Sequence, residues 1–255
     1  MPTAPGMEWH DEGPTGAARE RRFTLGRDGR TVQGVLWTPL QGAGPWPLVL
    51  IGHGGSGSKD EGYVVTLGRG LATTHRVAAA AIDGPVHGDR RKDPDATPIL
   101  VIAQFAQLWA GDGETMTDTM VADWRAVLSA LLELPELRGG PVGWWGVSMG
   151  TILGLPLIAA DPRISVAVLG LMGLTGPTRA RIERDAPRVR CPVLFLVQWD
   201  DEMFPREDAL ALWATLGSPD KRLHAHPGPH GALPSEAFES SVAFLVARLR
   251  APAPG

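Results

Sequence analysis

The chain has 255 residues, of which 44% are hydrophobic and 20% charged, and its formal net charge is −4. This length suits one large domain with a sizeable core, and the composition is that of an ordinary globular protein. Because the charge is slightly negative and Lys and Arg are scattered, nothing marks a nucleic-acid or anionic membrane surface. No run approaches the roughly 18 apolar residues of a membrane-spanning helix, so we expect a cytoplasmic protein.

Both ends of the chain are expected to be flexible. Residues 1–20 are rich in Pro, Gly, Ala and charge, and residues 251–255 consist only of Ala, Pro and Gly. Such terminal segments are often poorly ordered. The sequence therefore predicts a single domain over residues 21–250.

A β-hairpin is expected between residues 22 and 40. Apolar and β-branched residues at 23–25 and 31–37 flank the dipeptide Asp28-Gly29. This dipeptide strongly favours a tight two-residue turn.

Apolar runs follow the hairpin and alternate with segments of helical length. The runs are residues 48–51, 77–82, 142–145, 166–172, 193–197 and, more weakly, 223–226; the helical segments are 61–75, 115–134, 151–160, 206–216 and 235–249. Strands that are apolar throughout and alternate with helices indicate a mostly parallel sheet with helices on both faces. Ligands of such sheets bind beyond the carboxyl ends of the strands.

Three places depart from this regular pattern. The interval 87–113 exceeds an ordinary connection, and its apolar stretch 98–110 predicts either a flap over the cleft or one more surface helix. The interval 173–190 is too short for a large lid domain. Pro156 lies inside an expected helix, where proline costs about 3 kcal/mol, so a kink or an early break is expected there.

The most informative motif is Gly146-x-Ser148-x-Gly150, which lies between an apolar strand and an apolar helical segment. In a nucleophile elbow with this pattern, a sharp turn lifts the serine hydroxyl clear of the sheet. The glycines are needed because larger side chains would collide where the strand turns into the helix. The bare pattern is moderate evidence, and Ser148 could instead only cap the helix. The strand-to-helix context favours the nucleophile.

A serine hydroxyl is a weak nucleophile unless a base takes its proton and a third group orients that base. On an α/β sheet with this elbow, the partners follow in the order Ser, acid, His. His230, in a loop rich in Gly and Pro after the last strand, is the predicted base. Asp200 and Asp201 follow the preceding strand and compete for the role of the acid.

With these residues in this order, the chain resembles the α/β-hydrolase superfamily over about residues 31–249. The lidless layout and the segments DGPVHG at 83–88 and DEMFP at 201–205 are similar to the dienelactone-hydrolase-like and small bacterial esterase branch. Dienelactone hydrolases proper carry cysteine at the position of Ser148, so their lactone substrate is not carried over. The family usually places the acid four residues before the loop proline, which favours Asp201; Asp200 would then cap its loop.

The resemblance also implies an oxyanion hole made of two backbone N–H groups. Met149, which follows the nucleophile, supplies the first. The second is expected from Gly55, with Gly54 as the fallback. A flexible turn or a phosphate cradle is the alternative for this glycine-rich loop, but the loop lacks the spacing and the lysine of a P-loop. We expect His53 to be a structural residue of the loop.

Three residues are candidates for contact with the substrate: His87, Trp109 in the stretch 98–110, and Trp199 beside the acid. The neighbouring tryptophans at 144 and 145 are expected in the core. Cys191 is the only cysteine, which excludes an intramolecular disulfide, and we expect it to be a buried, inert thiol.

The sequence thus predicts a serine hydrolase that cleaves a carboxylic ester of a small-molecule substrate through an acyl-enzyme intermediate. Thioesterases, acyltransferases, amide hydrolases and C–C bond hydrolases use the same three residues, and a non-catalytic relative that binds a small molecule is a further alternative. No metal or other cofactor is expected, because His224 and His226 lack a carboxylate at a matching spacing. We expect a monomer or a homodimer.

Overall fold

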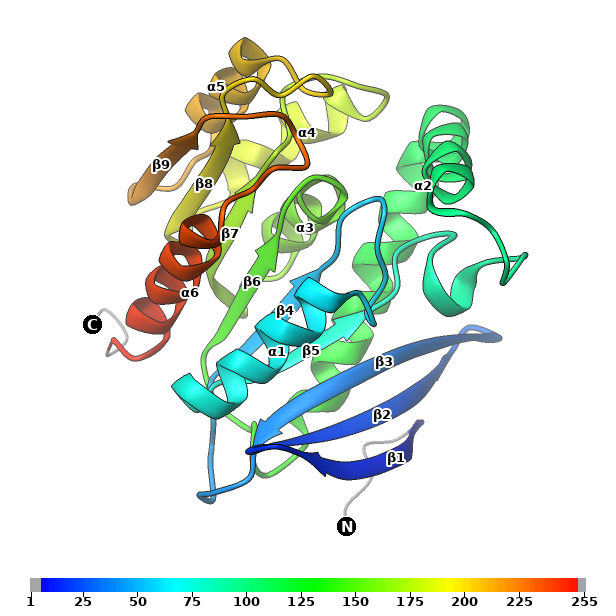
Figure 1. The fold of residues 1–255 in the computed structure, drawn as a ribbon, viewed down its shortest axis with the longest axis vertical. Coiled ribbons are helices and arrows are strands. Elements are labelled where there is room, and N and C mark those ends of the chain that lie inside the picture. The colour runs from blue at the N-terminus through cyan, green and yellow to red at the C-terminus, as the bar shows by residue number, and fades with distance from the viewer. Residues whose placement is uncertain (1–5, 252–255) are drawn as a thin grey trace.

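The computed structural model describes residues 6–251, and within them nine strands form one mixed sheet in the order β1-β2-β3-β5-β4-β6-β7-β8-β9. The first three strands run antiparallel along one edge: β1 (Met7–Thr15), β2 (Ala18–Arg27) and β3 (Arg30–Pro39). The other six are parallel to one another (Figure 1): β4 (Leu48–Gly52), β5 (Ala78–Ile82), β6 (Val142–Gly146), β7 (Ile164–Gly170), β8 (Val193–Gln198) and β9 (Lys221–His226). The predicted, mostly parallel sheet is confirmed.

Helices cover both faces of this sheet (Figure 1). α1 (Gly62–His75) and α6 (Ser235–Leu249) contribute to the hydrophobic core on one face. The core on the other face includes residues of α2 (Pro98–Leu132), α3 (Met149–Ala160), α4 (Arg179–Asp185) and α5 (Arg206–Thr215). Two short 3-10 helices, η1 (Gly88–Arg90) and η2 (Ala186–Arg188), complete the described elements. The short α4 occupies the interval that was expected to be too short for a lid domain.

Successive residues of the central strands alternate between these two cores. In β7, Ala167 lies in the core with α2 and α3, whereas Val166 and Val168 lie in the core with α1 and α6. Because both faces of the sheet are covered, residues on both sides must be apolar, which explains the uninterrupted apolar runs. Trp144 and Trp145 divide in the same way and are both fully buried, as predicted.

The start of the chain differs from the flexible segment that was expected for residues 1–20. From residue 7 onward it forms β1 and the beginning of β2, so one more strand and a longer β2 belong to the domain. Met7 pairs with Leu25 and Trp9 pairs with Phe23, and the rings of Trp9 and Phe23 meet edge to face with centroids 5.8 Å apart. These contacts bury apolar surface, which orders the segment despite its polar composition. Residues 1–5 and most of the predicted C-terminal tail lie outside the described residues.

The predicted hairpin is confirmed as β2 and β3. Asp28 and Gly29 connect the strands with φ of 49° and 71°, so both lie in the left-handed region that a type I′ turn requires. A type I′ turn matches the twist of the two strands that it joins.

Pro156 does not end the helix in which it lies. α3 continues through it to Ala160, so the early break, one of the two outcomes expected there, does not occur. Every residue from Met149 to Ile158 is buried. Packing of this helix, which is apolar except for Thr151, therefore outweighs the hydrogen bond that a proline removes.

The stretch expected at 98–110 and the helical segment after it form the single long helix α2. The backbone of Asp112 departs from helical geometry, with φ −144° and ψ 39°, so two helical segments join at a kink. The first of these segments reaches the functional site described below.

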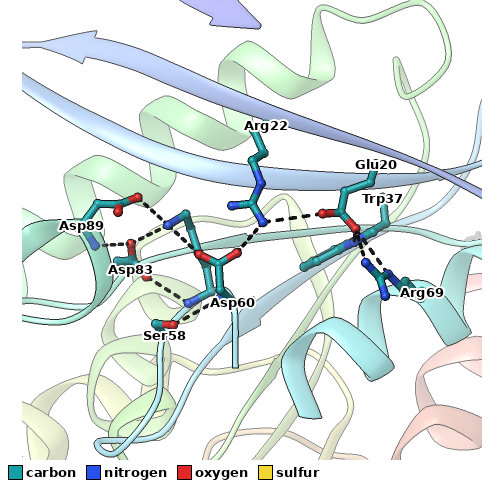
Figure 2. A network of polar contacts seen from close by, with 9 residues as sticks. Glu20, Arg22, Trp37, Ser58, Asp60, Arg69, Asp83 and Asp89 are labelled. Carbon is teal, nitrogen blue, oxygen red and sulfur yellow. Dashed lines mark hydrogen bonds and ion pairs between the residues drawn. The ribbon is translucent and has the colours of Figure 1, made fainter. Parts of the chain in front are cut away.

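A chain of ion pairs joins the antiparallel edge to the loops that follow β4 and β5 (Figure 2). Lys59 is buried, and its Nζ lies 2.9 Å from Asp83 Oδ2 and 2.6 Å from Asp89 Oδ2. Burial by itself lowers the pKa of Lys59, but the carboxylates of Asp83, Asp89 and Asp60 outweigh it and raise the pKa to about 12. Asp60 also accepts a hydrogen bond from Arg22 of β2 at 2.6 Å. The paired charges hold the two loops beside each other.

Two glycines of α1 predict opposite effects of the same substitution. A Cβ at Gly68 would overlap the ring of Trp37, whereas a Cβ at Gly70 would meet nothing within 4 Å. Gly68→Ala is expected to lower the free energy of unfolding by about 1–3 kcal/mol through overpacking. Gly70→Ala should raise it by up to about 1 kcal/mol, because alanine favours the helix. Urea denaturation of both variants measures this, and equal effects would contradict the packing of α1 on Trp37.

Candidate active site

Ser148 lies in the sharp turn between β6 and α3. Its φ of 57° and ψ of −122° are values that residues with a side chain rarely adopt. The backbone N–H of Ser148 donates to Gly170 O, at the end of β7, at 2.9 Å. A Cβ at Gly146 would lie 2.9 Å from Gly150 O, and a Cβ at Gly150 would overlap Gly52 O. Both glycines of the motif are therefore required by close backbone contacts.

A continuous hydrogen-bonded chain links Ser148 to His230 and Asp201. Ser148 Oγ is 3.0 Å from His230 Nε2, and His230 Nδ1 is 2.8 Å from Asp201 Oδ2. Because a carboxylate only accepts, Nδ1 carries the ring proton in the neutral histidine, and Nε2 is left to accept from the serine hydroxyl. The arrangement has the geometry required for His230 to take a proton from Ser148.

Backbone contacts fix the orientation of the Asp201 carboxylate. Its second oxygen, Oδ1, accepts from the N–H groups of Met203 and Phe204 at 2.8 and 2.9 Å. The side chain is only 4% exposed, so it is shielded from solvent beside the imidazole. The sequence preference for Asp201 as the partner of the histidine agrees with this geometry.

Asp200 makes a different set of contacts. Its Oδ2 accepts from the N–H of Gly228 at 3.0 Å, and its own N–H donates to Gly228 O at 3.2 Å. Asp200 thus joins the loop that follows β8 to the loop that carries His230, in line with the loop-capping role expected for it. Glu202 adds a second link, because its Oε2 accepts from the His230 N–H at 2.8 Å.

Met149 and Gly55, whose backbone N–H groups are the expected oxyanion donors, line the same pocket as Ser148. Neither N–H has a hydrogen-bond partner within residues 6–251. Gly54 is not equivalent, because its N–H donates to Tyr63 Oη at 2.7 Å. In the described part of the chain the expected pair of N–H groups therefore has no partner, whereas the N–H of the fallback, Gly54, is engaged.

The ring of His53 hydrogen-bonds to two backbone groups, one in the glycine loop after β4 and one in the loop after β5. Its Nδ1 lies 2.8 Å from Gly54 O, and its Nε2 accepts from the Gly84 N–H at 2.8 Å. Because a backbone N–H only donates, Nε2 is unprotonated and Nδ1 carries the proton. Complete burial lowers the pKa of His53 to about 4, so the ring remains neutral near pH 7.

A pocket of about 420 Å³ has Ser148 and His230 in its wall. Most of the remaining wall is apolar and comes from α2, α3, α6, the end of β6 and the loops at the carboxyl ends of the strands. The apolar residues are Ile102, Phe105, Ala106, Trp109, Trp145, Val147, Ile152, Leu171, Met203, Phe204, Leu233 and Phe238. Glu61 and Ser56 add polar groups.

The first segment of α2 forms one wall of this pocket, so the stretch 98–110 is a surface helix that also covers the cleft. Trp109 lines the pocket, and its Nε1 donates to Thr178 Oγ1 at 2.8 Å. Its ring stacks on Phe105 with centroids 6.1 Å apart. On its outer side the same segment exposes apolar residues, among them Ile99, which is 81% exposed.

Two of the predicted substrate contacts lie elsewhere. His87 is fully buried and does not line the pocket; its ring nitrogens face the carbonyl oxygens of Pro85 and Gly55. Trp199 is 44% exposed, lies under the guanidinium of Arg206 at 4.2 Å, and is also absent from the lining. Trp199 is the first residue after β8 and lies in the turn before Asp201, so it is beyond the buried part of the strand.

Sequence reasoning missed Tyr63, the only tyrosine of the chain. It lies in the first turn of α1, lines the pocket and accepts from the Gly54 N–H. Burial raises its pKa to about 12, so the hydroxyl keeps its proton near neutral pH. Its position just after the glycine loop was the available signal. Phe238 of α6 packs against Tyr63 at 6.1 Å and was missed as well.

His224, His226 and Cys191, which the sequence also singled out, do not line this pocket. Within residues 6–251, no group of three or more His, Cys, Asp or Glu is arranged to hold a metal ion. Cys191 is half-buried rather than fully buried, and burial raises its pKa to about 12, which leaves it an unreactive thiol near neutral pH. No helix in the described part of the chain has the length and apolarity to cross a membrane.

The chain matches no family model and no curated protein, but it resembles many solved structures. It is 40% identical to a cold-adapted esterase from an Arctic intertidal metagenomic library, solved in a PEG-bound complex, with a TM-score of 0.84 over 95% of this chain and 100% of that chain. An acetyl xylan esterase from Paenibacillus sp. R4 is 17% identical, with a TM-score of 0.67 over 94% and 87%. A Klebsiella pneumoniae protein assigned to the dienelactone hydrolases is 16% identical, with a TM-score of 0.72 over 92% and 99%.

The chain belongs to the α/β-hydrolase superfamily, in the family of this cold-adapted esterase, and it shares its fold with the dienelactone hydrolase and the acetyl xylan esterase. It is a serine hydrolase of the carboxylesterase type. The resemblance stated from the sequence is thus confirmed.

The different contacts of Asp200 and Asp201 predict different effects of the same substitution. Asp201→Asn should lower kcat by orders of magnitude, on the scale of about 10⁴-fold, because an amide cannot hold His230 in the tautomer that accepts from Ser148. Asp200→Asn should cost far less, because the Asp200 carboxylate hydrogen-bonds to the backbone of Gly228 and not to His230. Steady-state kinetics with p-nitrophenyl butyrate measures both; the reverse ranking would assign the acid to Asp200.

Proposed function

We propose that the protein hydrolyses carboxylic esters with short acyl groups through an acyl-enzyme intermediate on Ser148. The observation that carries this proposal is the chain from Ser148 Oγ through His230 to Asp201, beside two unpartnered N–H groups in one apolar pocket. These groups suit the hydrolysis of an ester. The serine with its base supplies the nucleophile, and the N–H groups stabilise the oxyanion that forms on the carbonyl oxygen.

In the first half of the reaction, His230 Nε2 takes the proton of Ser148 as Oγ attacks the carbonyl carbon of the ester. The carbonyl oxygen becomes an oxyanion, which accepts from the N–H groups of Met149 and Gly55; a single such donor contributes about 10²- to 10³-fold to kcat. Asp201 stabilises the imidazolium that forms. His230 then gives its proton to the leaving oxygen, and the alcohol departs as the C–O bond breaks.

In the second half, a water molecule takes the place of the alcohol. His230 removes a proton from this water, whose oxygen attacks the acyl carbon of the ester to Ser148. The same two N–H groups receive the second oxyanion. Return of the proton from His230 to Ser148 Oγ breaks the acyl bond and releases the carboxylic acid, so the enzyme is restored without a cofactor.

The pocket supports a short acyl group. Its volume is about 420 Å³, and the cover over it is the first segment of α2 rather than a separate lid domain. Thioesters and amides remain alternatives because the same residues can attack them. The 40% identity to a protein described as an esterase favours the oxygen ester.

The setting of the proposed reaction is the cytoplasm, and its substrate is a small molecule. A single half-buried thiol is compatible with a reducing compartment. Ser148, His230 and Asp201 come from one chain, so the site is complete in a monomer and in each half of a homodimer.

Acyl-chain length tests this proposal. We expect kcat/KM for p-nitrophenyl acetate and butyrate to exceed that for the decanoate and the palmitate. Each methylene that fits contributes about 0.8 kcal/mol of burial, and each that does not fit clashes with the walls. Thioester and anilide analogues of the best substrate should be cleaved more slowly.

Ser148→Ala is the matched control and should abolish turnover of every ester in the series. Retained activity in this variant would refute a serine nucleophile at this position. A steady rise of kcat/KM up to the palmitate, or a jump in rate above the micelle concentration, would instead indicate a lipase.

A further inference from the structure

The N–H of Gly55 lies in a loop that glycines make intrinsically mobile. Residues 54, 55 and 57 are all glycine, and a Cβ at Gly55 would meet nothing within 4 Å. Local sterics therefore do not fix the backbone angles of Gly55. An oxyanion donor works only when it is already aimed at the oxygen, so other contacts must hold this loop.

The peptide unit that precedes Gly55 is held on its carbonyl side. Gly54 O accepts from the Gly57 N–H at 3.1 Å and from His53 Nδ1 at 2.8 Å. The N–H of Gly55 belongs to this same planar unit and points the opposite way. His53 and the turn thus orient one side of Gly55.

The peptide unit that follows Gly55 is held by a histidine from another loop. His87, in the loop after β5, has its Nε2 2.8 Å from Gly55 O. His87 is fully buried, and its ring packs edge to face against His53 at 5.1 Å and Phe105 at 5.8 Å. Its neighbours therefore fix the position of the ring.

We propose that His87 is a positioning residue of the oxyanion hole, whose Nε2–H donates to Gly55 O and thereby aims the Gly55 N–H at the oxyanion. With the peptide units on both sides of Gly55 held, its two backbone angles are determined. This inference rests on the proposed function, because it takes Gly55 as an oxyanion donor. His87 itself does not line the pocket, so its effect belongs to the transition state rather than to substrate binding.

The second ring nitrogen of His87 faces a different carbonyl oxygen, so the two contacts of the ring can be tested separately by substitution. Nδ1 lies 2.6 Å from Pro85 O, which, like Gly55 O, is a carbonyl that only accepts. The amide nitrogen of a glutamine at position 87 can replace Nε2, and that of an asparagine can replace Nδ1. A neutral imidazole carries one ring proton, so it donates to only one of the two carbonyls, and the proposal places that proton on Nε2. His87→Gln therefore puts an N–H opposite Gly55 O, whereas His87→Asn puts one opposite Pro85 O.

The experiment compares His87→Ala, His87→Gln and His87→Asn by steady-state kinetics with p-nitrophenyl butyrate. We expect kcat to fall by about 10²-fold in the alanine and asparagine variants with KM unchanged, as for a misplacement of about 1 Å. His87→Gln should recover most of kcat. The inhibition constant of butylboronic acid, which forms a tetrahedral adduct with serine, should rise in parallel with the loss of kcat.

Backbone dynamics supply a readout that does not depend on turnover. The ¹⁵N order parameter of the Gly55 amide should be that of rigid backbone, about 0.85, in the wild type and in His87→Gln. It should fall in His87→Ala and His87→Asn. Calorimetric melting of each variant monitors folding. His10→Gln, at a histidine of β1 whose Nε2 hydrogen-bonds to Thr24 Oγ1 at 3.0 Å, is the control for the exchange itself.

The outcomes separate this inference from the proposed function. Unchanged kcat in all three variants, rescue by asparagine instead of glutamine, or equal changes in kcat and KM would overturn the role of His87 while ester hydrolysis by Ser148 stands. A wild type that cleaves no ester, or an active Ser148→Ala, would refute the proposed function. The order parameter of Gly55 would then still decide whether His87 fixes this loop.

Discussion

The conformation of one residue, Ser148, depends on packing from both of the elements that it joins. A backbone with φ of 57° costs about 1–3 kcal/mol and persists only where its surroundings impose it. Here β6 and nearly all of α3 are buried, and the hydroxyl of Thr151, in the first turn of α3, bonds Gly170 at the end of β7. Gly170 O in turn accepts from the N–H of Ser148. Two neighbouring strand ends thus fix the direction of the serine hydroxyl.

The other groups of the site reach Ser148 through contacts between loops rather than through regular structure. Asp200 and Glu202 join the loop with Asp201 to the loop with His230, because their carboxylates accept from backbone N–H groups of the second loop. At β4 and β5, the buried ion pair of Lys59 and Asp83 joins the loops that follow these two strands. These loops carry His53 and His87, which hydrogen-bond to the backbone on either side of the Gly55 N–H. The sheet therefore places the loops of the site, and hydrogen bonds from side chains to backbone atoms orient the groups that these loops carry.

The parts of the fold that could be predicted from the sequence are those with a local pattern. The elbow at Ser148, the Asp28-Gly29 turn and the fully apolar strands each follow from short-range sterics or from burial on two faces. The direction of a loop side chain has no such local signal, and for that reason His87 and Trp199 were placed wrongly. The first strand was missed because only Met7 and Trp9 carry its alternation. The choice of Asp201 over its neighbour came from resemblance, not from physics.

Covalent labelling tests most directly whether Ser148 is the nucleophile that His230 activates. Treatment with a fluorophosphonate, followed by mass spectrometry of peptides, should show one adduct per chain, located on Ser148. The same treatment of His230→Ala should label the serine far more slowly, because no base removes its proton. An adduct on another serine, or labelling of Ser148 at an equal rate without His230, would contradict the account.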